Sequence, residues 1–381
     1  MKKLIFFLLL SSFSFGKDYF IYIASESDDT VSLIKFDGKN TTEIERIPVG
    51  IKFSEIEGPH GITIDPSGDY WYLSLAHGNP YGSLTKFSTE TNKAVAKTEL
   101  GIFPATMQIS NLTGLLYCVN FKLHGLMTPS TVSVVDPVTM IEITKIETGV
   151  MPHGSRISPN GKYQYSVAMM SGELYEVDAV SLKVNRVLKL DEMQMVHGEG
   201  MHNGHGEGMQ MVHGEGMHNG HGEGMQMVHG EGMYHSKVQP TWVTPHPTDS
   251  KVYVTGNASN EIIEVDTNTW TITNRFKTAG KAPYNTDISS DGSRMVITLK
   301  GEGKTEIKNL KTGKSKLVNN TTKVSHGVVI SPDNKFAFIS VEGIGGEPGK
   351  LDVIDIRKAK LVSSIEVGKQ AGGIALWKIE E

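Results

Sequence analysis

The stretch KVYVTGNASNEIIEVDTNTW, residues Lys251–Trp270, shows the pattern that decides the fold. A run rich in β-branched residues, KVYVTG, is followed by a polar turn, a second such run, EIIEVD, and another turn. Short apolar runs bounded by Asn, Ser, Asp and Thr predict antiparallel strands joined by tight turns. The flanking sequence supplies one more strand on each side, so the unit predicts a meander of four strands.

This unit recurs at intervals of roughly 45 residues, a period at which a propeller is the first architecture to consider. Each unit opens on a short anchor motif, and there are seven anchors. They are Pro59-His60-Gly61, Pro104-Ala105-Thr106, Pro152-His153-Gly154, Pro240-Thr241-Trp242, Pro283-Tyr284-Asn285, Ser325-His326-Gly327 and Ala371-Gly372-Gly373. Four strands per unit and seven units predict an all-β, seven-bladed β-propeller.

The two ends of the chain complete one blade between them. Residues Tyr19–Val49 have the pattern of a second, third and fourth strand, whereas Ala371–Lys378 has the pattern of a first strand alone. We therefore expect the N- and C-terminal strands to share the closing blade, because closure of the ring removes the exposed sheet edges.

The segment Lys251–Trp270, together with the Pro-His-Gly anchors and turns such as SPNGK and SPDNK, resembles the YVTN-repeat, or YncE-like, family of seven-bladed propellers. The resemblance covers the chain apart from its first residues and one insertion, and it implies the fold. It implies little about activity, because such propellers include surface-layer proteins, lactonase-like enzymes and the copper-bearing domain of nitrous oxide reductase. The cysteine-rich cupredoxin module of that reductase is missing from this sequence.

The one long interval between anchors contains an insertion of perfect repeats. The unit MQMVHGEGMHNGHGEG runs from Met193 to Gly208, repeats unchanged from Met209 to Gly224 and restarts at Met225. The insertion holds eight of the 14 histidines and nine of the 17 methionines. Imidazole and thioether both bind copper, thioether favours Cu(I), and glycine lets the backbone wrap an ion. The alternative is a recent tandem duplication without function.

The candidate copper ligands of this insertion are its histidines and methionines. They are His197, His202, His205, His213, His218, His221, His229, His235, Met193, Met195, Met201, Met209, Met211, Met217, Met225, Met227 and Met233.

The first residues have the pattern of an export signal. Lys2 and Lys3 precede the apolar run Leu4–Leu10, and small residues follow at Ser14 and Gly16. The run is too short to span a bilayer, so we expect a periplasmic or secreted protein without a membrane span. The predicted division is a signal peptide at 1–16, blades at 17–190, the His/Met/Gly-rich insertion at 191–238 and further blades at 239–381.

Composition excludes several kinds of site. Cys118 is the only cysteine, which excludes an internal disulfide, a CxxC zinc site and covalent CxxCH haem, and its apolar setting predicts a buried thiol. The net charge of −5 and the absence of a basic run give no reason to expect nucleic acid as a partner. No GxSxG, P-loop or HExxH motif occurs, so the sequence leaves open whether the protein is an enzyme.

Five of the six remaining histidines are expected on one face of the propeller. In a four-stranded meander the anchors, the loops after the second strands and the links between blades all lie at the same end. His60, His153 and His326 belong to anchors, whereas His77 and His124 follow second strands. Any one of them could simply satisfy loop backbone. Their convergence favours a shared metal or anion site near the central channel, on the face from which the insertion also arises.

Other residues at equivalent positions could complete this face. They are Met169, Met170, Trp242, Asn285, Lys300 and Glu342. Lys300 and Glu342 could do acid–base work, although two unpaired surface charges are the commoner arrangement. His246 lies in the turn between a first and a second strand, so we expect it at the surface of the opposite face.

These patterns favour an exported copper-binding propeller that handles copper or takes part in a copper-dependent redox step. Its partners would be the metal ion and a periplasmic redox or copper-transfer protein. The alternatives are a lactonase-like hydrolase that uses the same face as a pocket, and an interaction scaffold in the cell envelope.

Overall fold

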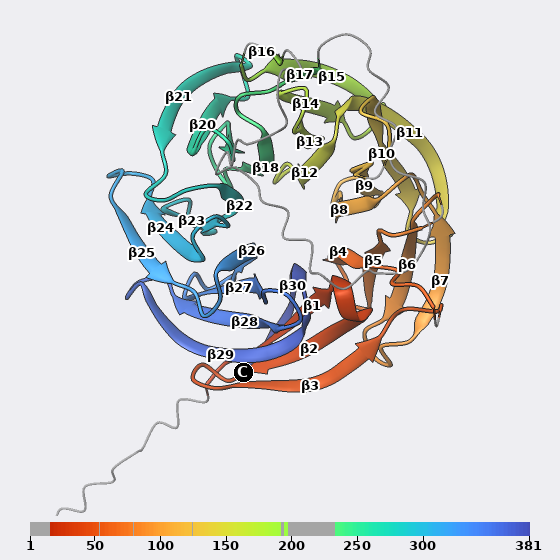
Figure 1. The fold of residues 1–381 in the computed structure, drawn as a ribbon, viewed down its shortest axis with the longest axis vertical. Coiled ribbons are helices and arrows are strands. Elements are labelled where there is room, and N and C mark those ends of the chain that lie inside the picture. The colour runs from red at the N-terminus through yellow and green to blue at the C-terminus, as the bar shows by residue number, and fades with distance from the viewer. Residues whose placement is uncertain (1–15, 53, 79, 124, 192–193, 197–232) are drawn as a thin grey trace, which may run out of the picture.

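The computed structural model describes residues 16–52, 54–78, 80–123, 125–191, 194–196 and 233–381. Seven four-stranded antiparallel sheets surround a central channel, and the first strand of each sheet lies innermost (Figure 1). The described helical structure is one 3-10 turn, η1 (Glu26–Asp28). The prediction of an all-β, seven-bladed propeller is confirmed.

The strands follow one another blade by blade from the inside to the outside. The first three blades contain β4 (Pro59–Ile64), β5 (Tyr70–Leu75), β6 (Ser83–Ser88) and β7 (Ala94–Glu99); β8 (Pro104–Ile109), β9 (Leu116–Asn120), β10 (Pro129–Asp136) and β11 (Ile141–Val150); and β12 (Pro152–Ile157), β13 (Tyr163–Ala168), β14 (Glu173–Asp178) and β15 (Lys183–Lys189). The next three contain β18 (Pro240–Pro245), β19 (Lys251–Gly256), β20 (Glu261–Asp266) and β21 (Thr271–Lys277); β22 (Pro283–Ile288), β23 (Arg294–Leu299), β24 (Lys304–Asn309) and β25 (Ser315–Asn319); and β26 (Val324–Ile330), β27 (Phe336–Glu342), β28 (Pro348–Asp355) and β29 (Lys360–Lys369).

The closing blade joins the two ends of the chain, as predicted. It contains β30 (Ala371–Glu380), β1 (Asp18–Ser25), β2 (Thr30–Phe36) and β3 (Thr41–Pro48), in that order from the channel outward. In the pairing of β1 with β30, Ile21 lies opposite Leu376 and Ile23 lies opposite Ile374. The red and blue ends of the ribbon therefore meet in one sheet (Figure 1).

Packing between blades explains the burial pattern of the strands. Inner strands such as β5 and β19 are buried on both faces, whereas the outermost strand β15 alternates between exposed and half-buried residues. A strand that lies between two neighbouring sheets must be apolar on both sides, whereas a rim strand covers the core with one side only. Trp71 shows the contact between blades, because its ring stacks on Phe87 within its own blade and on Tyr22 of the closing blade.

The insertion joins the blade of β15 to the blade of β18. Its described ends pair as a short hairpin of β16 (Gln194–Val196) and β17 (Met233–His235). The Asp191 carboxylate accepts hydrogen bonds from the Ser236 hydroxyl and the Val238 amide, which ties the two ends together. The Ser236 amide donates to the Met170 carbonyl in the loop after β13 at 3.0 Å, so the insertion arises from the predicted face.

Several predicted residues lie outside the described part of the chain. They are residues 1–15 of the predicted signal peptide, His124, Met193, and the insertion ligands from His197 to His229. Met195 and Met233 are described as members of β16 and β17, and His235 is half-buried at the end of β17.

Replacing residues 197–232 with the turn Asn-Gly should leave the propeller as stable as the full chain. Val196 lies opposite Met233 in the hairpin, so a two-residue turn can join them. We expect the midpoint of thermal unfolding to change by no more than about 2 °C, because the Asp191 and Ser236 contacts between the two ends are kept. Calorimetry of both proteins without metal provides the measurement. A large decrease would show that the insertion packs on the ring.

His246 corrects one expectation. It does lie in the turn between β18 and β19, but it is only 6% exposed and is therefore not a surface residue. Its Nδ1 accepts a hydrogen bond from the Asp249 amide, and its Nε2 lies 3.1 Å from the Gly292 carbonyl of the next blade. The ring fills the gap between two neighbouring turns, which the position of His246 within its own hairpin could not indicate.

Cys118 is buried with no exposed surface, as predicted, and burial raises the pKa of its thiol above the ordinary range.

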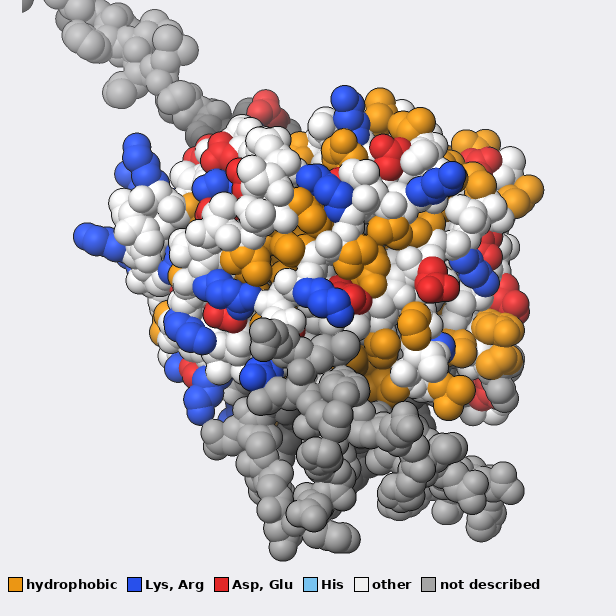
Figure 2. Space-filling view, turned by 90° about the horizontal axis from the view of Figure 1, so that it is seen from above, with side chains coloured by type: hydrophobic (Ala, Val, Ile, Leu, Met, Phe, Trp, Pro, Cys, Tyr) orange, Lys and Arg blue, Asp and Glu red, His pale blue; other side chains and the backbone are white. Residues whose placement is uncertain are grey.

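In the described ranges no helix has the length and apolar character needed to cross a membrane. The edge-on view of Figure 2 shows acidic and basic side chains interspersed, with no described histidine visible on that side of the ring.

Candidate functional site

The second residue of each anchor lies at an equivalent place beside the central channel. The pairing of the innermost strand is irregular there, with a register shift between Pro59 and Ile62 in the first blade and matching shifts in the others. Such bulges re-aim side chains and are frequent next to functional sites. These second residues are His60, Ala105, His153, Thr241, Tyr284, His326 and Gly372.

Four of these side chains form one aromatic cluster. The His60 ring centroid lies 6.4 Å from that of His153 and 6.1 Å from that of His326. The Tyr284 ring lies 5.2 Å from His153 and 4.7 Å from His326. The prediction that the anchor histidines converge is therefore confirmed. Tyr284 completes the cluster, although the sequence pattern gave no reason to separate it from the other anchor residues.

A glycine at the third place of an anchor allows a close approach of the neighbouring blade. A Cβ atom on Gly61 would lie 1.9 Å from the Ala105 carbonyl oxygen, and one on Gly373 would lie 2.0 Å from the His60 carbonyl oxygen. At these two contacts the innermost strands of neighbouring blades lie too close together for a side chain to fit. The Ser74 hydroxyl lies 2.7 Å from the Gly61 amide and 3.0 Å from the Ala105 carbonyl, and so links the two blades.

His153 is held in one neutral form. Its Nδ1 donates to the Thr241 carbonyl at 2.8 Å, and its Nε2 accepts a hydrogen bond from the Tyr284 hydroxyl at 2.9 Å. Burial and the nearby charges of His60 and Lys300 together lower the pKa of His153 to about 3, although its hydrogen bond to Thr241 opposes this shift. Burial also raises the pKa of Tyr284 to about 12, so its hydroxyl keeps its proton. Because both ring nitrogens are occupied, His153 would have to lose a hydrogen bond to bind a metal.

Glu26 connects two of the predicted histidines. Its carboxylate lies 3.0 Å from Nδ1 of His60 through one oxygen and 2.9 Å from Nε2 of His77 through the other. Glu26 is only 9% exposed. Burial raises its pKa, but the hydrogen bonds and charges of His60 and His77 outweigh this effect and hold the pKa below its ordinary value.

Sequence reasoning missed Glu26, although a signal was available. Glu26 directly follows β1, which is the second strand of the closing blade, and Glu342 and Lys300 occupy the same place at β27 and β23. The sequence analysis expected residues that follow second strands to lie on this face. Glu26 meets the same condition, because β1 is the second strand of the closing blade.

Lys300, Glu342 and His326 form a second polar group at the channel mouth. Nζ of Lys300 lies 2.8 Å from Glu342, so the expectation of two unpaired charges is wrong. The pair forms because the two residues end adjacent second strands beside a narrow channel. Burial alone would lower the pKa of Lys300, but the charge of Glu342 and its hydrogen bond raise it above the ordinary value. The His326 pKa is lowered well below 6.5 by burial and by Lys300, so this ring is neutral.

Of the other residues predicted to line this face, two pack in the hydrophobic core and two border the channel. Met169 is 2% exposed and belongs to a hydrophobic cluster with Phe103 and Phe121, against which Met170 packs. Trp242 and Asn285 border a narrow cavity of about 40 Å³ on the channel, together with the three anchor histidines and Arg156. Arg156 was not identified from the sequence, because a single arginine within a strand resembles any other half-buried surface residue.

Within the described ranges, no group of three or more His, Cys, Asp or Glu side chains is placed to hold a metal ion as it stands. The nearest arrangement is Glu26 with His60 and His77, in which protons occupy the two contacts between nitrogen and oxygen. His326 approaches Glu342 only to 3.8 Å.

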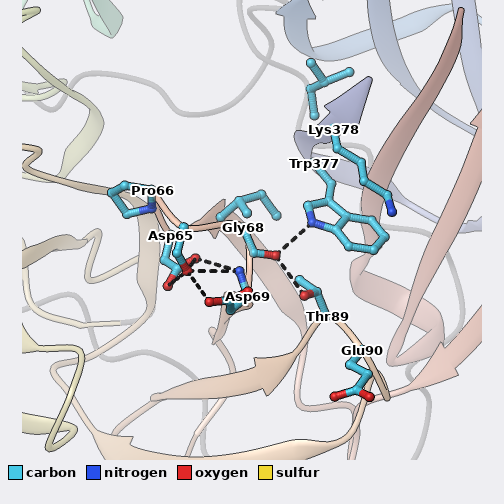
Figure 3. Close-up of a pocket in the computed structure, with 11 residues that line it drawn as sticks. Asp65, Pro66, Gly68, Asp69, Thr89, Glu90, Trp377 and Lys378 are labelled. Carbon is cyan, nitrogen blue, oxygen red and sulfur yellow. Dashed lines mark hydrogen bonds between the residues drawn. The ribbon is translucent and has the colours of Figure 1, made fainter. Parts of the chain in front are cut away.

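A wider hollow lies on the opposite face, at the turns between β4 and β5 and between β6 and β7 (Figure 3). The Trp377 indole donates to the Gly68 carbonyl at 2.9 Å, and the Thr89 hydroxyl donates to the same oxygen at 2.8 Å. Asp65 and Asp69 both accept hydrogen bonds from the Ser67 hydroxyl. These polar groups form hydrogen bonds with one another, so they have fewer donors and acceptors left to bind a ligand than the residues of the channel.

The match to a protein family extends over most of the blades. A model of the YNCE-like beta-propeller family matches residues 116–342. The chain belongs to this family. A search of curated proteins finds no match to this YNCE-like propeller.

Solved structures share the fold at low sequence identity. A functionally unknown protein from Desulfotomaculum acetoxidans is 16% identical, with a TM-score of 0.64 over 94% of this YNCE-like chain and 98% of that chain. Hydrazine synthase from Kuenenia stuttgartiensis is 18% identical, with a TM-score of 0.57 over 82% and 80% of the two chains. A candidate 6-phosphogluconolactonase from Bacteroides uniformis is 12% identical, with a TM-score of 0.64 over 94% and 99%. Similarity at this level shows the fold alone.

Proposed function

We propose that this YNCE-like propeller is exported and binds copper as its cargo, using the channel mouth and the His/Met-rich insertion. The observation that carries the proposal is the convergence of His60 and His77 on the single buried carboxylate of Glu26. Both ends of the insertion lie on the same face, because Ser236 hydrogen-bonds to the loop after β13. The insertion therefore begins and ends on the face at which a copper ion would reach His60 and His77.

The donor set fits copper in chemical type. Two imidazoles and one carboxylate suit Cu(II), whereas the thioethers of the insertion suit the softer Cu(I). Metal would enter the Glu26 group by replacing the protons that His60 and His77 now share with the carboxylate. His153 contributes less, because Thr241 and Tyr284 hold both of its nitrogens.

The insertion would act as a collector of copper and the channel mouth as a site of higher affinity. A periplasmic redox or copper-transfer protein would then supply or receive the ion. A lactonase-like hydrolase and an envelope scaffold are the alternatives, and neither predicts stoichiometric copper.

Copper titration of three proteins tests this proposal: the full chain, the chain with 197–232 replaced by Asn-Gly, and a chain with the nine insertion methionines changed to Leu. Leu keeps the size and apolar character of Met but removes the sulfur, so the third protein should lose most of its Cu(I) capacity and keep its Cu(II) binding. The protein with 197–232 replaced keeps Met193, Met195, Met233 and His235 of the insertion, and it should still bind one copper ion tightly at the Glu26 group.

The double change His60→Gln and His77→Gln in the protein without the insertion should remove that last ion. His246→Gln is the matched control, because His246 lies in a turn on the opposite face. If the protein without the insertion binds no copper, the channel histidines have another role, and only the insertion remains as a copper binder. If none of the proteins binds copper, the proposal is wrong.

A further inference from the structure

The narrow cavity of about 40 Å³ on the channel has an unusual lining. Among the described residues that border it, Arg156 carries a permanent positive charge and none is a carboxylate. Trp242, Asn285 and His326 border it as well. The electrostatic character of this space is therefore cationic, in contrast to the channel mouth, where Glu26 and Glu342 balance the basic groups.

Three buried polar atoms of these lining residues have no hydrogen-bond partner among the residues that the structure describes. They are Nε1 of Trp242, Oδ1 of Asn285 and Nδ1 of His326. The three residues are 4%, 4% and 9% exposed. Buried polar atoms are almost always paired, and an unpaired one costs about 1 to 3 kcal/mol. Three of them around one cavity indicate that a polar guest satisfies them.

Arg156 strengthens the indication of a guest with negative charge. Its guanidinium stacks over the Trp242 ring at 4.3 Å, and its one hydrogen bond within the described chain runs from Nη1 to the Ser155 carbonyl at 3.0 Å. Burial, partly offset by the charge of Asp287, lowers the pKa of Arg156 to about 10. Asp287 accepts from the amides of Ile288 and Ile330 and forms no ion pair with Arg156 in the described chain. Arg156 therefore stays cationic at neutral pH without a direct counter-charge.

We infer that this cavity binds a small planar oxyanion, of the size of nitrate, bicarbonate or formate, beside the stacked Arg156 guanidinium and Trp242 indole. A planar guanidinium fork matches two oxygens of such an anion, and Nε1 of Trp242 supplies another donor. The cavity of about 40 Å³ exceeds the roughly 10 to 15 Å³ that one water molecule needs, so it has room for a guest larger than a single water. Of the three anions, only bicarbonate has a protonated oxygen, which could donate to Oδ1 of Asn285; nitrate and formate would leave this acceptor to a water molecule.

This site does not depend on the copper proposal. His60 borders the cavity and also belongs to the proposed copper group, but Arg156 and Trp242 are not proposed copper ligands, and Glu26 and His77 do not border the cavity. A substitution of Trp242 therefore changes anion binding while copper binding stays as it was, and the two proposals can fail separately.

Isothermal titration of the full chain with sodium nitrate and with sodium formate, in chloride-free buffer, tests the inference. One saturable site per chain is expected, and sodium sulfate should bind at least tenfold more weakly because it is larger and tetrahedral. Trp242→Phe keeps the stacked ring and removes the N–H donor, so the dissociation constant should rise about fivefold. Arg156→Gln should raise it roughly tenfold to hundredfold.

Arg46→Gln is the matched control, because Arg46 pairs with Glu43 at the exposed rim and should leave the titration unchanged. Circular dichroism checks the fold of each variant; if Arg156→Gln does not fold, Trp242→Phe decides the matter. The inference is overturned if the full chain gives no saturable heat with either anion, in which case water fills the cavity. It is also overturned if Trp242→Phe binds as tightly as the full chain, since the anion then lies elsewhere.

Discussion

A chain that ends at Gln370 should lose most of its folding stability, because β30 is the innermost strand of the closing blade. Without it the pairing edge of β1 is open and the buried side chains of Tyr19, Ile21 and Ile23 lose their cover. Exposing three large apolar side chains costs more than about 5 kcal/mol, which is comparable with the whole stability of a domain. Urea unfolding followed by circular dichroism measures the loss, and light scattering detects association through the open edge.

Two comparisons make this result specific to ring closure. Replacing residues 197–232 removes more of the chain but should leave the urea midpoint unchanged. A synthetic peptide of residues 371–381 added to the truncated chain should restore part of the stability, because an extended peptide can pair with an open sheet edge. If the truncated chain unfolded at the same urea concentration as the full chain, the closing blade would not be the element that holds the ring together.

Glu26→Gln should lower the unfolding free energy at pH 7 by about 3 kcal/mol, because hydrogen bonds to a buried charged group contribute about 1.5 to 3 kcal/mol each and Gln can keep only part of them. The carboxylate accepts from both His60 and His77, which extend from the adjacent blade. Urea unfolding of the metal-free proteins measures the change. Glu55→Gln is the control, because Glu55 forms an exposed pair with Lys52 and no other ion pair in the described chain, and should show no measurable change.

The same substitution should change the response to acid. The folded pKa of Glu26 lies below its ordinary value, so the carboxylate contributes stability above the unfolded pKa of about 4.3 and loses it as the pH falls further. The unfolding free energy of the full chain should therefore decrease as the pH falls below about 5, partly because Glu26 becomes protonated. The Glu26→Gln protein should lack the part of this decrease that Glu26 causes. Equal acid sensitivity of the two proteins would contradict the role assigned to Glu26.

The fold could be predicted in detail because its signals are local and repeated. Strand alternation, turn residues and the anchor motif of each blade lie within about one repeat of one another, and seven copies fix both the blade number and the shared closing blade. The position of the insertion followed from the same period. The convergence of His60, His153 and His326 on one face was also predictable, since equivalent positions in a closed ring point to the same axis.

Sequence alone thus determined the blades, their closure and the face on which the anchor histidines lie. Only the tertiary structure decided which side chains meet: Glu26 with His60 and His77, Tyr284 with His153, and Lys300 with Glu342. The partners in each contact come from different blades, and whether they reach hydrogen-bond distance depends on the bulge at each anchor and on the spacing of neighbouring sheets. A repeat pattern gives the angular order of positions around the ring, but a hydrogen bond requires placement to within a few tenths of an ångström, which packing of the whole ring sets.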